Sequence, residues 1–231
     1  IALGFLGFFL SRYMAAYQLG HIDSAWDPFF GNGTERILDS DVSHAWPISD
    51  AGLGAAVYML EALMGLMGDQ RRWRTMPWMV TFFAILVVPL GITSIVLVIL
   101  QPLAVGTWCT LCLAAALAML VMIPLTLDEV VAMTQFLVQS HHEGKSVWRV
   151  FWLGGTVEGS AMDQRSPATD LPSRTTVPAM LWGMTVPWPL LLSTALGIWL
   201  MFAPDIFGSR GAAADSDHLF GALVVVFAMI A

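Results

Sequence analysis

Residues 104–126 read AVGTWCTLCLAAALAMLVMIPLT, an apolar run that opens with two cysteines three positions apart, Cys109 and Cys112. A helix that crosses a bilayer needs about 20 mostly apolar residues, and this run is long enough. The Cys-x-x-Cys spacing holds two sulfurs close enough to alternate between a dithiol and a disulfide. The stretch therefore predicts a membrane helix with a redox-active pair at one end.

The rest of the chain is equally apolar. Of its 231 residues, 57% are hydrophobic and 12% are charged, whereas soluble domains carry about 25% charged residues. The net charge of −7 argues against nucleic-acid binding, because no basic patch is present to neutralise phosphates. Further spans are predicted at 1–19, 51–68, 77–100 and 187–204, and a sixth begins near 219. We expect an all-α, polytopic membrane protein in which the first four spans form a four-helix bundle.

Charged loops orient the predicted bundle. The densest positive cluster, Asp69-Gln-Arg-Arg-Trp-Arg74, separates the second and third spans, and short loops rich in Lys and Arg stay in the cytoplasm. The loop 20–50 and the turn at Gln101-Pro102 then lie outside, and residues 127–176 lie inside. The cysteine pair is therefore predicted at the outer end of the fourth span, where disulfides persist.

The loops predict three domains, 1–126, 127–176 and 177–231. The outer loop 20–50 is expected to dock as a lid over the bundle mouth through its apolar side chains, which are Trp26, Phe29, Phe30, Ile37, Leu38 and Trp46. Residues 127–141 have helical spacing and are expected to lie along the inner membrane face. The segment 154–176, rich in Gly, Ser, Thr and Pro, predicts a flexible linker.

Two charges fall inside predicted spans, Arg12 in the first and Glu61 in the second. Charges within a membrane usually face the bundle interior and pair with each other. We therefore expect an Arg12–Glu61 ion pair, with a proton route as the functional alternative.

The cysteine pair has two further interpretations. Cysteine packs as a small hydrophobic residue, so Cys109 and Cys112 could be two ordinary buried thiols. A metal site would need two more ligands, for which only His21 and His44 are possible partners, and we predict no metal.

Three segments resemble, in order and spacing, the vitamin K epoxide reductase family of membrane thiol–quinone oxidoreductases. One is the Cys-x-x-Cys at the start of the fourth span. The second, Gly33-Thr-Glu-Arg-Ile-Leu-Asp-Ser40, is similar to a family loop of the form Gly-Cys-x-x-Val-Leu-x-Ser. The third is Pro47-Ile-Ser-Asp-Ala-Gly-Leu-Gly54, at the entry to the second span. The resemblance covers about residues 1–126 and implies a quinone pocket at the outer mouth of the bundle.

The resemblance also implies roles for single residues. Cys112 would face a quinone of the menaquinone, ubiquinone or vitamin K type, and Cys109 would meet the shuttling thiol. Asp50 stands where the family has an Asn that hydrogen-bonds a quinone carbonyl, and Ser40 stands where it has a hydroxyl near the site. Trp108 completes the expected quinone contacts. For Asp50 an N-cap of the second span is an equally open interpretation.

Two departures from the family pattern bear on activity. The family usually has a second cysteine pair in the outer loop that relays electrons from a partner, but Thr34 stands at one of these positions and no cysteine precedes it. Ala116 stands where the family often has a tyrosine. We expect a bacterial variant whose disulfide is reduced directly by a thioredoxin-like dithiol protein, or a non-catalytic membrane scaffold or quinone-binding module.

The segment 177–231 differs in kind. Val186-Pro-Trp-Pro-Leu, followed by Ala203-Pro-Asp-Ile-Phe, weakly resembles the SPW-repeat membrane module. This predicts an accessory pair of transmembrane helices that contributes no chemistry.

Overall fold

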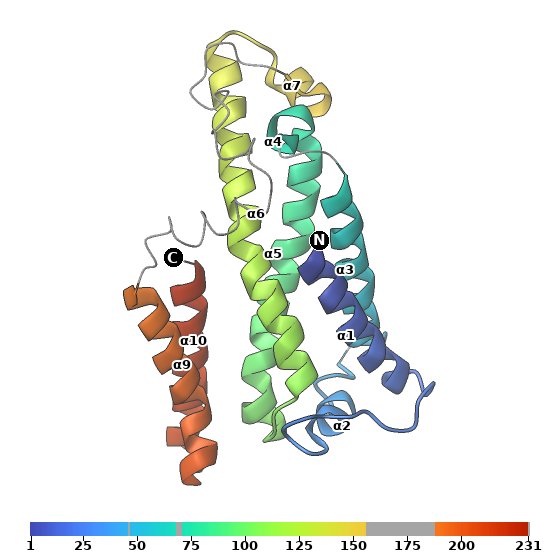
Figure 1. The fold of residues 1–231 in the computed structure, drawn as a ribbon, viewed down its shortest axis with the longest axis vertical. Coiled ribbons are helices and arrows are strands. Elements are labelled where there is room, and N and C mark those ends of the chain that lie inside the picture. Colours follow the sequence, from blue (N-terminus) through green and yellow to red (C-terminus); the bar gives the residue numbers. More distant parts are fainter. Residues whose placement is uncertain (46, 68–70, 156–187, 231) are drawn as a thin grey trace, which may run out of the picture.

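All regular secondary structure is helical in the part of the chain that the structure, a computed structural model, describes: residues 1–45, 47–67, 71–155 and 188–230. Its elements, shown in Figure 1, are α1 (Ala2–Gln18), α2 (Gly33–Leu38), α3 (Asp50–Leu66), α4 (Arg72–Thr75), α5 (Pro77–Leu100), the π-helical turn η1 (Gln101–Val105), α6 (Thr110–His142), α7 (Val147–Leu153), α9 (Trp188–Phe207) and α10 (Ala212–Ile230). The prediction of an all-α protein is confirmed.

The first four long helices close into a bundle. Helix α1 packs against α3 and α6, and α5 packs against α6 and α3, so each helix has two neighbours in the ring. The centre of this bundle is apolar and is formed by Tyr58, Phe83, Val87, Met119, Leu120, Met122 and Ile123. The predicted four-helix bundle is therefore confirmed.

Four helices among the described residues are long and apolar enough to cross a membrane. They are α5 with the turn that follows it, α6, α9 and α10. The outer faces of the bundle keep large apolar side chains exposed, among them Phe9, Leu60, Phe82, Ile85, Ile92 and Leu117, as lipid contact requires. Helices α1 and α3 have 17 residues each, at the short end of the roughly 17–25 residues that a span needs.

The fourth span differs from its prediction at both ends. Its helix begins at Thr110 and not at 104, because Gln101–Val105 wind into a π-helical turn that ends at the left-handed Gly106 (φ +70°). At the other end α6 continues without a break to His142. The helix predicted at 127–141 is therefore confirmed, but its placement along the membrane face is wrong, since it extends α6 (Figure 1). The predicted linker lies almost wholly outside the described residues.

The expected Arg12–Glu61 ion pair is wrong. Helix α1 turns Gly4, Gly7, Ser11 and Met14 toward the bundle, and Arg12 falls beside this stripe and is exposed. Glu61 is 1% exposed, and neither of its carboxylate oxygens has a hydrogen-bond partner among the described residues. Hydropathy placed both charges within spans but did not give the rotation of α1 about its own axis.

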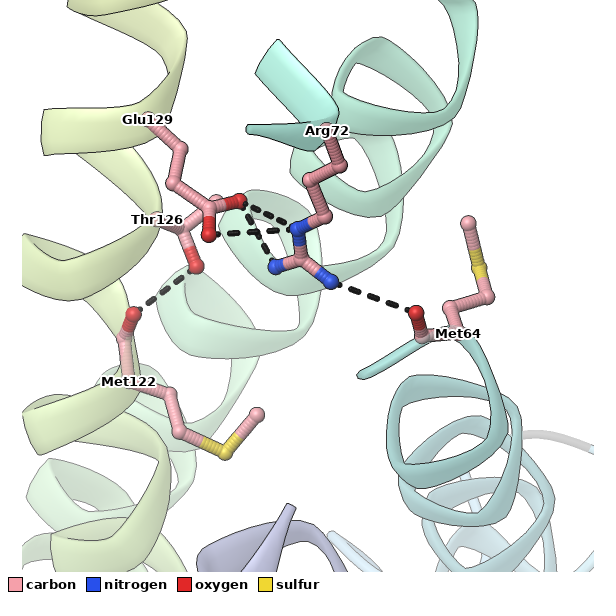
Figure 2. Close-up of polar contacts among 5 residues, drawn as sticks. All are labelled: Met64, Arg72, Met122, Thr126 and Glu129. Carbon is pink, nitrogen blue, oxygen red and sulfur yellow. Dashed lines mark hydrogen bonds and ion pairs between the residues drawn. The ribbon is translucent and has the colours of Figure 1, made fainter. Parts of the chain in front are cut away.

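One arginine holds the predicted inner end of the bundle together (Figure 2). Arg72 donates from Nε and Nη2 to the Glu129 carboxylate of α6 at 2.6–3.1 Å. Its Nη1 donates to the Met64 carbonyl at the end of α3 at 3.2 Å. The guanidinium also lies 5.1 Å from the centre of the Phe83 ring of α5. A single planar cation therefore joins three helices.

The C-terminal helices form a close pair, as predicted. Helices α9 and α10 pack against each other where two glycines meet, and a Cβ on Gly197 would lie 2.9 Å from the Gly221 carbonyl oxygen. Helix α10 also contacts α5, α6 and η1, so the pair lies against the bundle. Val186 and Pro187, which open the segment predicted to resemble the SPW-repeat module, fall outside the described residues.

We expect Arg72→Lys to destabilise the protein by about 2 kcal/mol, the usual scale for hydrogen bonds to charged groups. An ammonium cannot serve the carboxylate in a fork and reach the Met64 carbonyl together. Unfolding in detergent micelles measures the loss, with Arg12→Lys as a control on an exposed arginine. Equal stability of the two variants would show that Arg72 does not join the helices.

Candidate functional site

The two cysteines form a disulfide at the first turn of α6, with their Cα atoms 5.3 Å apart. Cys109 is the N-cap residue, and its sulfur accepts a hydrogen bond from the Cys112 N–H at 3.0 Å. Free N–H groups at a helix start stabilise negative charge, so the same contact would stabilise a thiolate when the bond is reduced. Cys109 is fully buried, at 0% exposed, whereas Cys112 is half-buried. The two cysteines are therefore exposed to different extents.

Apolar side chains from four segments surround the disulfide. Cys112 Sγ lies 3.5 Å from Met14 Sδ of α1. The remainder of this cluster around Cys109 comes from α1, the outer loop, α2 and α3, and consists of Ala15, Ala25, Leu38 and Ala51. Water is largely excluded from the buried sulfur as a result.

The backbone before Cys109 is fixed from two sides. The buried Gln101 of η1 accepts a hydrogen bond from the Cys109 N–H at 2.9 Å through Oε1. On the opposite side Gly33, at the start of α2, touches the Trp108 carbonyl oxygen so closely that a Cβ at this position would overlap it. Glycine is thus required here for α2 to reach α6.

Asp27 ties the outer loop to the start of α6. It is 6% exposed and accepts hydrogen bonds from Thr34 Oγ1, Thr110 Oγ1 and the N–H groups of Phe29, Phe30 and Thr110, at 2.5–3.1 Å. Burial alone would raise the pKa of Asp27, but the hydrogen bonds from Thr110, Phe30 and Thr34 hold it well below its usual range. The carboxylate is therefore ionised at neutral pH.

The predicted lid is present, but its expected anchors are partly wrong. Leu38 and Ala25 are buried against the site at 2% and 4% exposed, whereas Trp26 and Phe29 are 68% and 79% exposed. Trp46 lies outside the described residues. The lid docks through the polar Asp27 because five donors converge on its carboxylate, and the aromatic neighbours on either side are turned outward.

The three predicted quinone contacts each bond to the protein itself. Ser40 Oγ donates to the Ile37 carbonyl at 2.6 Å. Asp50 accepts hydrogen bonds from Gln18 Nε2 at 2.7 Å and from Ser43 Oγ at 3.0 Å. It is not the N-cap of the second span, because Ser49 has that role and accepts from the Gly52 N–H.

The third contact, Trp108, is 3% exposed and faces the C-terminal pair. Its Nε1–H donates to Asp205 Oδ2 of α9 at 2.6 Å, and its ring lies 4.9 Å from that of Phe202. A cleft of about 500 Å³ opens at this junction, lined by Phe30, Gly106, Thr107, Trp108, Phe202, Asp205 and Ile206. The residue directly before Cys109 is thus held by helices predicted to be accessory.

Thr34 lies directly over the buried sulfur, with Oγ1 3.5 Å from Cys109 Sγ. This is the residue that stands where the resemblance predicts a relay cysteine. Sequence reasoning assigned no role to Asp27, Gln101 and Thr110. The available signal was an acid within the apolar stretch Trp26–Phe30, where an Asp side chain commonly bonds the N–H two residues on.

The chain was compared with models of protein families, with curated proteins and with solved structures. The model of the Vitamin K epoxide reductase family matches residues 1–127, which include the disulfide, the lid and all four bundle helices up to the middle of α6. No curated protein and no solved structure matches the chain.

We expect Gly33→Ala to expose the buried sulfur. The new methyl group overlaps the Trp108 carbonyl, so the lid must move away from α6. After reduction, maleimide labelling of Cys109 should quicken by about tenfold, the effect of losing about 1.4 kcal/mol of docking energy. Site-resolved mass spectrometry gives the rate. Gly54→Ala is the control, since its Cβ would meet only ordinary contacts, the nearest at 3.5 Å. Equal labelling rates in the two variants would contradict the close contact between Gly33 and Trp108.

Proposed function

The chain belongs to the vitamin K epoxide reductase family, and from that premise we propose that it couples thiol–disulfide exchange at Cys109 and Cys112 to the reduction of a membrane quinone. The observation that carries this proposal is the unequal access to one disulfide. Cys109 is buried beneath Thr34, and Cys112 is half-buried beside Met14 at the bundle end.

The reaction has two balanced steps. In the first step a dithiol partner reduces the Cys109–Cys112 disulfide. A thiolate of the partner attacks one of the two sulfurs, which forms a mixed disulfide and releases the other cysteine. The second thiol of the partner then attacks the partner's own sulfur in the mixed disulfide, so that the chain is released as a dithiol and the partner leaves as a disulfide. The two thiols of the chain then give two electrons and two protons to the quinone, which becomes a hydroquinone, and the Cys109–Cys112 bond forms again. The chain is thus unchanged after one turnover.

The surroundings of Cys112 suit a hydrophobic, lipid-soluble substrate. The cluster around the disulfide is apolar, and α6 carries it within a helix long enough to cross a membrane. We propose Cys112 as the residue that faces a quinone of the menaquinone, ubiquinone or vitamin K type. Asp50, Ser40 and Trp108 stay as proposed contacts, although each would have to exchange a hydrogen bond inside the protein for one to the substrate.

The electrons are proposed to come from outside the chain. With Thr34 in the relay position, a thioredoxin-like dithiol protein would reduce the disulfide directly on the outer face of a bacterial membrane, where it would serve disulfide formation in exported proteins. This requires the lid to move, because Cys109 is 0% exposed. The lid and the domain limits 1–126, 127–176 and 177–231 are part of the same proposal.

Quinol formation tests the function. We expect the purified protein to reduce menaquinone or ubiquinone analogues with a dithiol donor, and Cys109→Ser and Cys112→Ser each to abolish this, because either change removes the disulfide. Ser24→Ala, at an exposed loop position, is the matched control. Quinol formation that persists in both cysteine variants would refute the redox role. A wild-type protein that binds quinone without turnover would support a scaffold instead.

A second test uses the place of Thr34. With Oγ1 3.5 Å from Cys109 Sγ, Thr34→Cys combined with Cys112→Ser should yield a disulfide between positions 34 and 109 after mild oxidation, detectable as a cross-linked peptide pair. Ser24→Cys with Cys112→Ser is the control. A free thiol at position 34 under oxidising conditions would show that the loop does not lie over the buried sulfur.

A further inference from the structure

We propose that Asp27 is a positioning residue that shifts the thiol–disulfide equilibrium of Cys109 and Cys112 toward the disulfide, by holding a buried negative charge beside Cys109 and engaging the only hydrogen of the Thr34 hydroxyl. This inference deepens the proposed function and rests on it for its purpose. The equilibrium itself is a property of the cysteine pair and is measured without a quinone.

The hydroxyl of Thr34 is the first part of the argument. A threonine hydroxyl has one hydrogen to donate. Thr34 Oγ1 lies 2.8 Å from Asp27 Oδ2 and 3.5 Å from Cys109 Sγ, so the shorter contact to the ionised acceptor takes that hydrogen. The sulfur is left facing the oxygen lone pairs. A thiolate at Cys109 would therefore receive no hydrogen bond from the Thr34 hydroxyl.

The charge of Asp27 is the second part. Among the described residues its five hydrogen-bond donors are all neutral N–H or O–H groups, so they hold the carboxylate in its ionised form without cancelling its charge. Both Asp27 and Cys109 are buried, at 6% and 0% exposed, where water screens charges weakly. The carboxylate opposes negative charge on the sulfur, and the Cys112 N–H favours it.

These two effects act on the reduced form of the pair. A disulfide has no charge for Asp27 to repel, whereas a reduced pair with thiolate character at Cys109 is destabilised. A dithiol whose reduced form is destabilised is a stronger reductant, just as stabilising that form makes a pair oxidising. Asp27 therefore suits a pair that passes electrons onward to a quinone.

The test is the equilibrium Cys109–Cys112 disulfide + 2 glutathione ⇌ dithiol + glutathione disulfide, measured on the full chain in detergent by alkylation and mass spectrometry. Asp27→Asn removes the charge and frees the Thr34 hydrogen for the sulfur. We expect the equilibrium to move about tenfold toward the dithiol, which corresponds to a reduction potential about 30 mV more positive.

Three variants separate this effect from a loss of structure. Asp27→Glu keeps the charge and should lie closer to the wild type than Asp27→Asn does. Asp23→Asn removes an exposed charge from the same loop and should leave the equilibrium unchanged. In Asp27→Asn/Thr34→Val no hydroxyl is left for the sulfur, so part of the shift should be lost, as a double-mutant cycle measures.

Thr34→Val alone keeps the proposal testable even if Asp27→Asn does not fold. Because the wild-type hydroxyl gives nothing to the sulfur, this variant should lie within about threefold of the wild type, a difference of well under 30 mV. A tenfold shift toward the disulfide would overturn the proposal, as would an Asp27→Asn equilibrium equal to that of the wild type. Either result would leave quinone reduction by the wild type standing, and failure of quinone reduction would leave the shift standing.

Discussion

The hydrogen bonds at the first turn of α6 are the interaction on which the outer end of the molecule depends. Cys109 caps the helix with its sulfur, Gln101 holds the same residue by its N–H, and Asp27 binds both the N–H and the hydroxyl of Thr110. Because three segments meet at one helix start, the disulfide, the lid and the π-helical turn form a single unit. Moving the helix start by one residue would separate them.

The sequence predicted well those features that depend on a continuous stretch of residues. Length and hydropathy give the helices, the bundle and the C-terminal pair, and a pattern of three short segments gives the family. The phase of a helix is different. Arg12 lies one residue beside the stripe that faces the bundle, and in a helix that is apolar nearly all round, hydropathy hardly distinguishes one face from another. The ion pair with Glu61 was predicted wrongly for that reason.

Of the candidate site, the sequence predicted the two cysteines but not the residues that hold them in place. Asp27 and Thr110 are separated by 83 positions and Trp108 and Asp205 by 97, and no local propensity reports a hydrogen bond between such distant residues. The lid illustrates the same limit. Its aromatic side chains suggested hydrophobic docking, whereas a carboxylate with five donors supplies the contact, because a buried acceptor must be satisfied. The contact between the C-terminal pair and the site is likewise visible only in the structure, where Trp108 donates a hydrogen bond to Asp205.

The unbroken course of α6 has a mechanical consequence. Its 33 residues make a rod of about 50 Å at 1.5 Å per residue, which is held at its start by the Asp27 and Gln101 contacts and near its middle by the Arg72–Glu129 ion pair. A shift of α6 along its own axis would break both sets of contacts at once. A movement of the lid alone would therefore expose the buried sulfur at a lower cost. Helix α6 could stay in place while the lid moves.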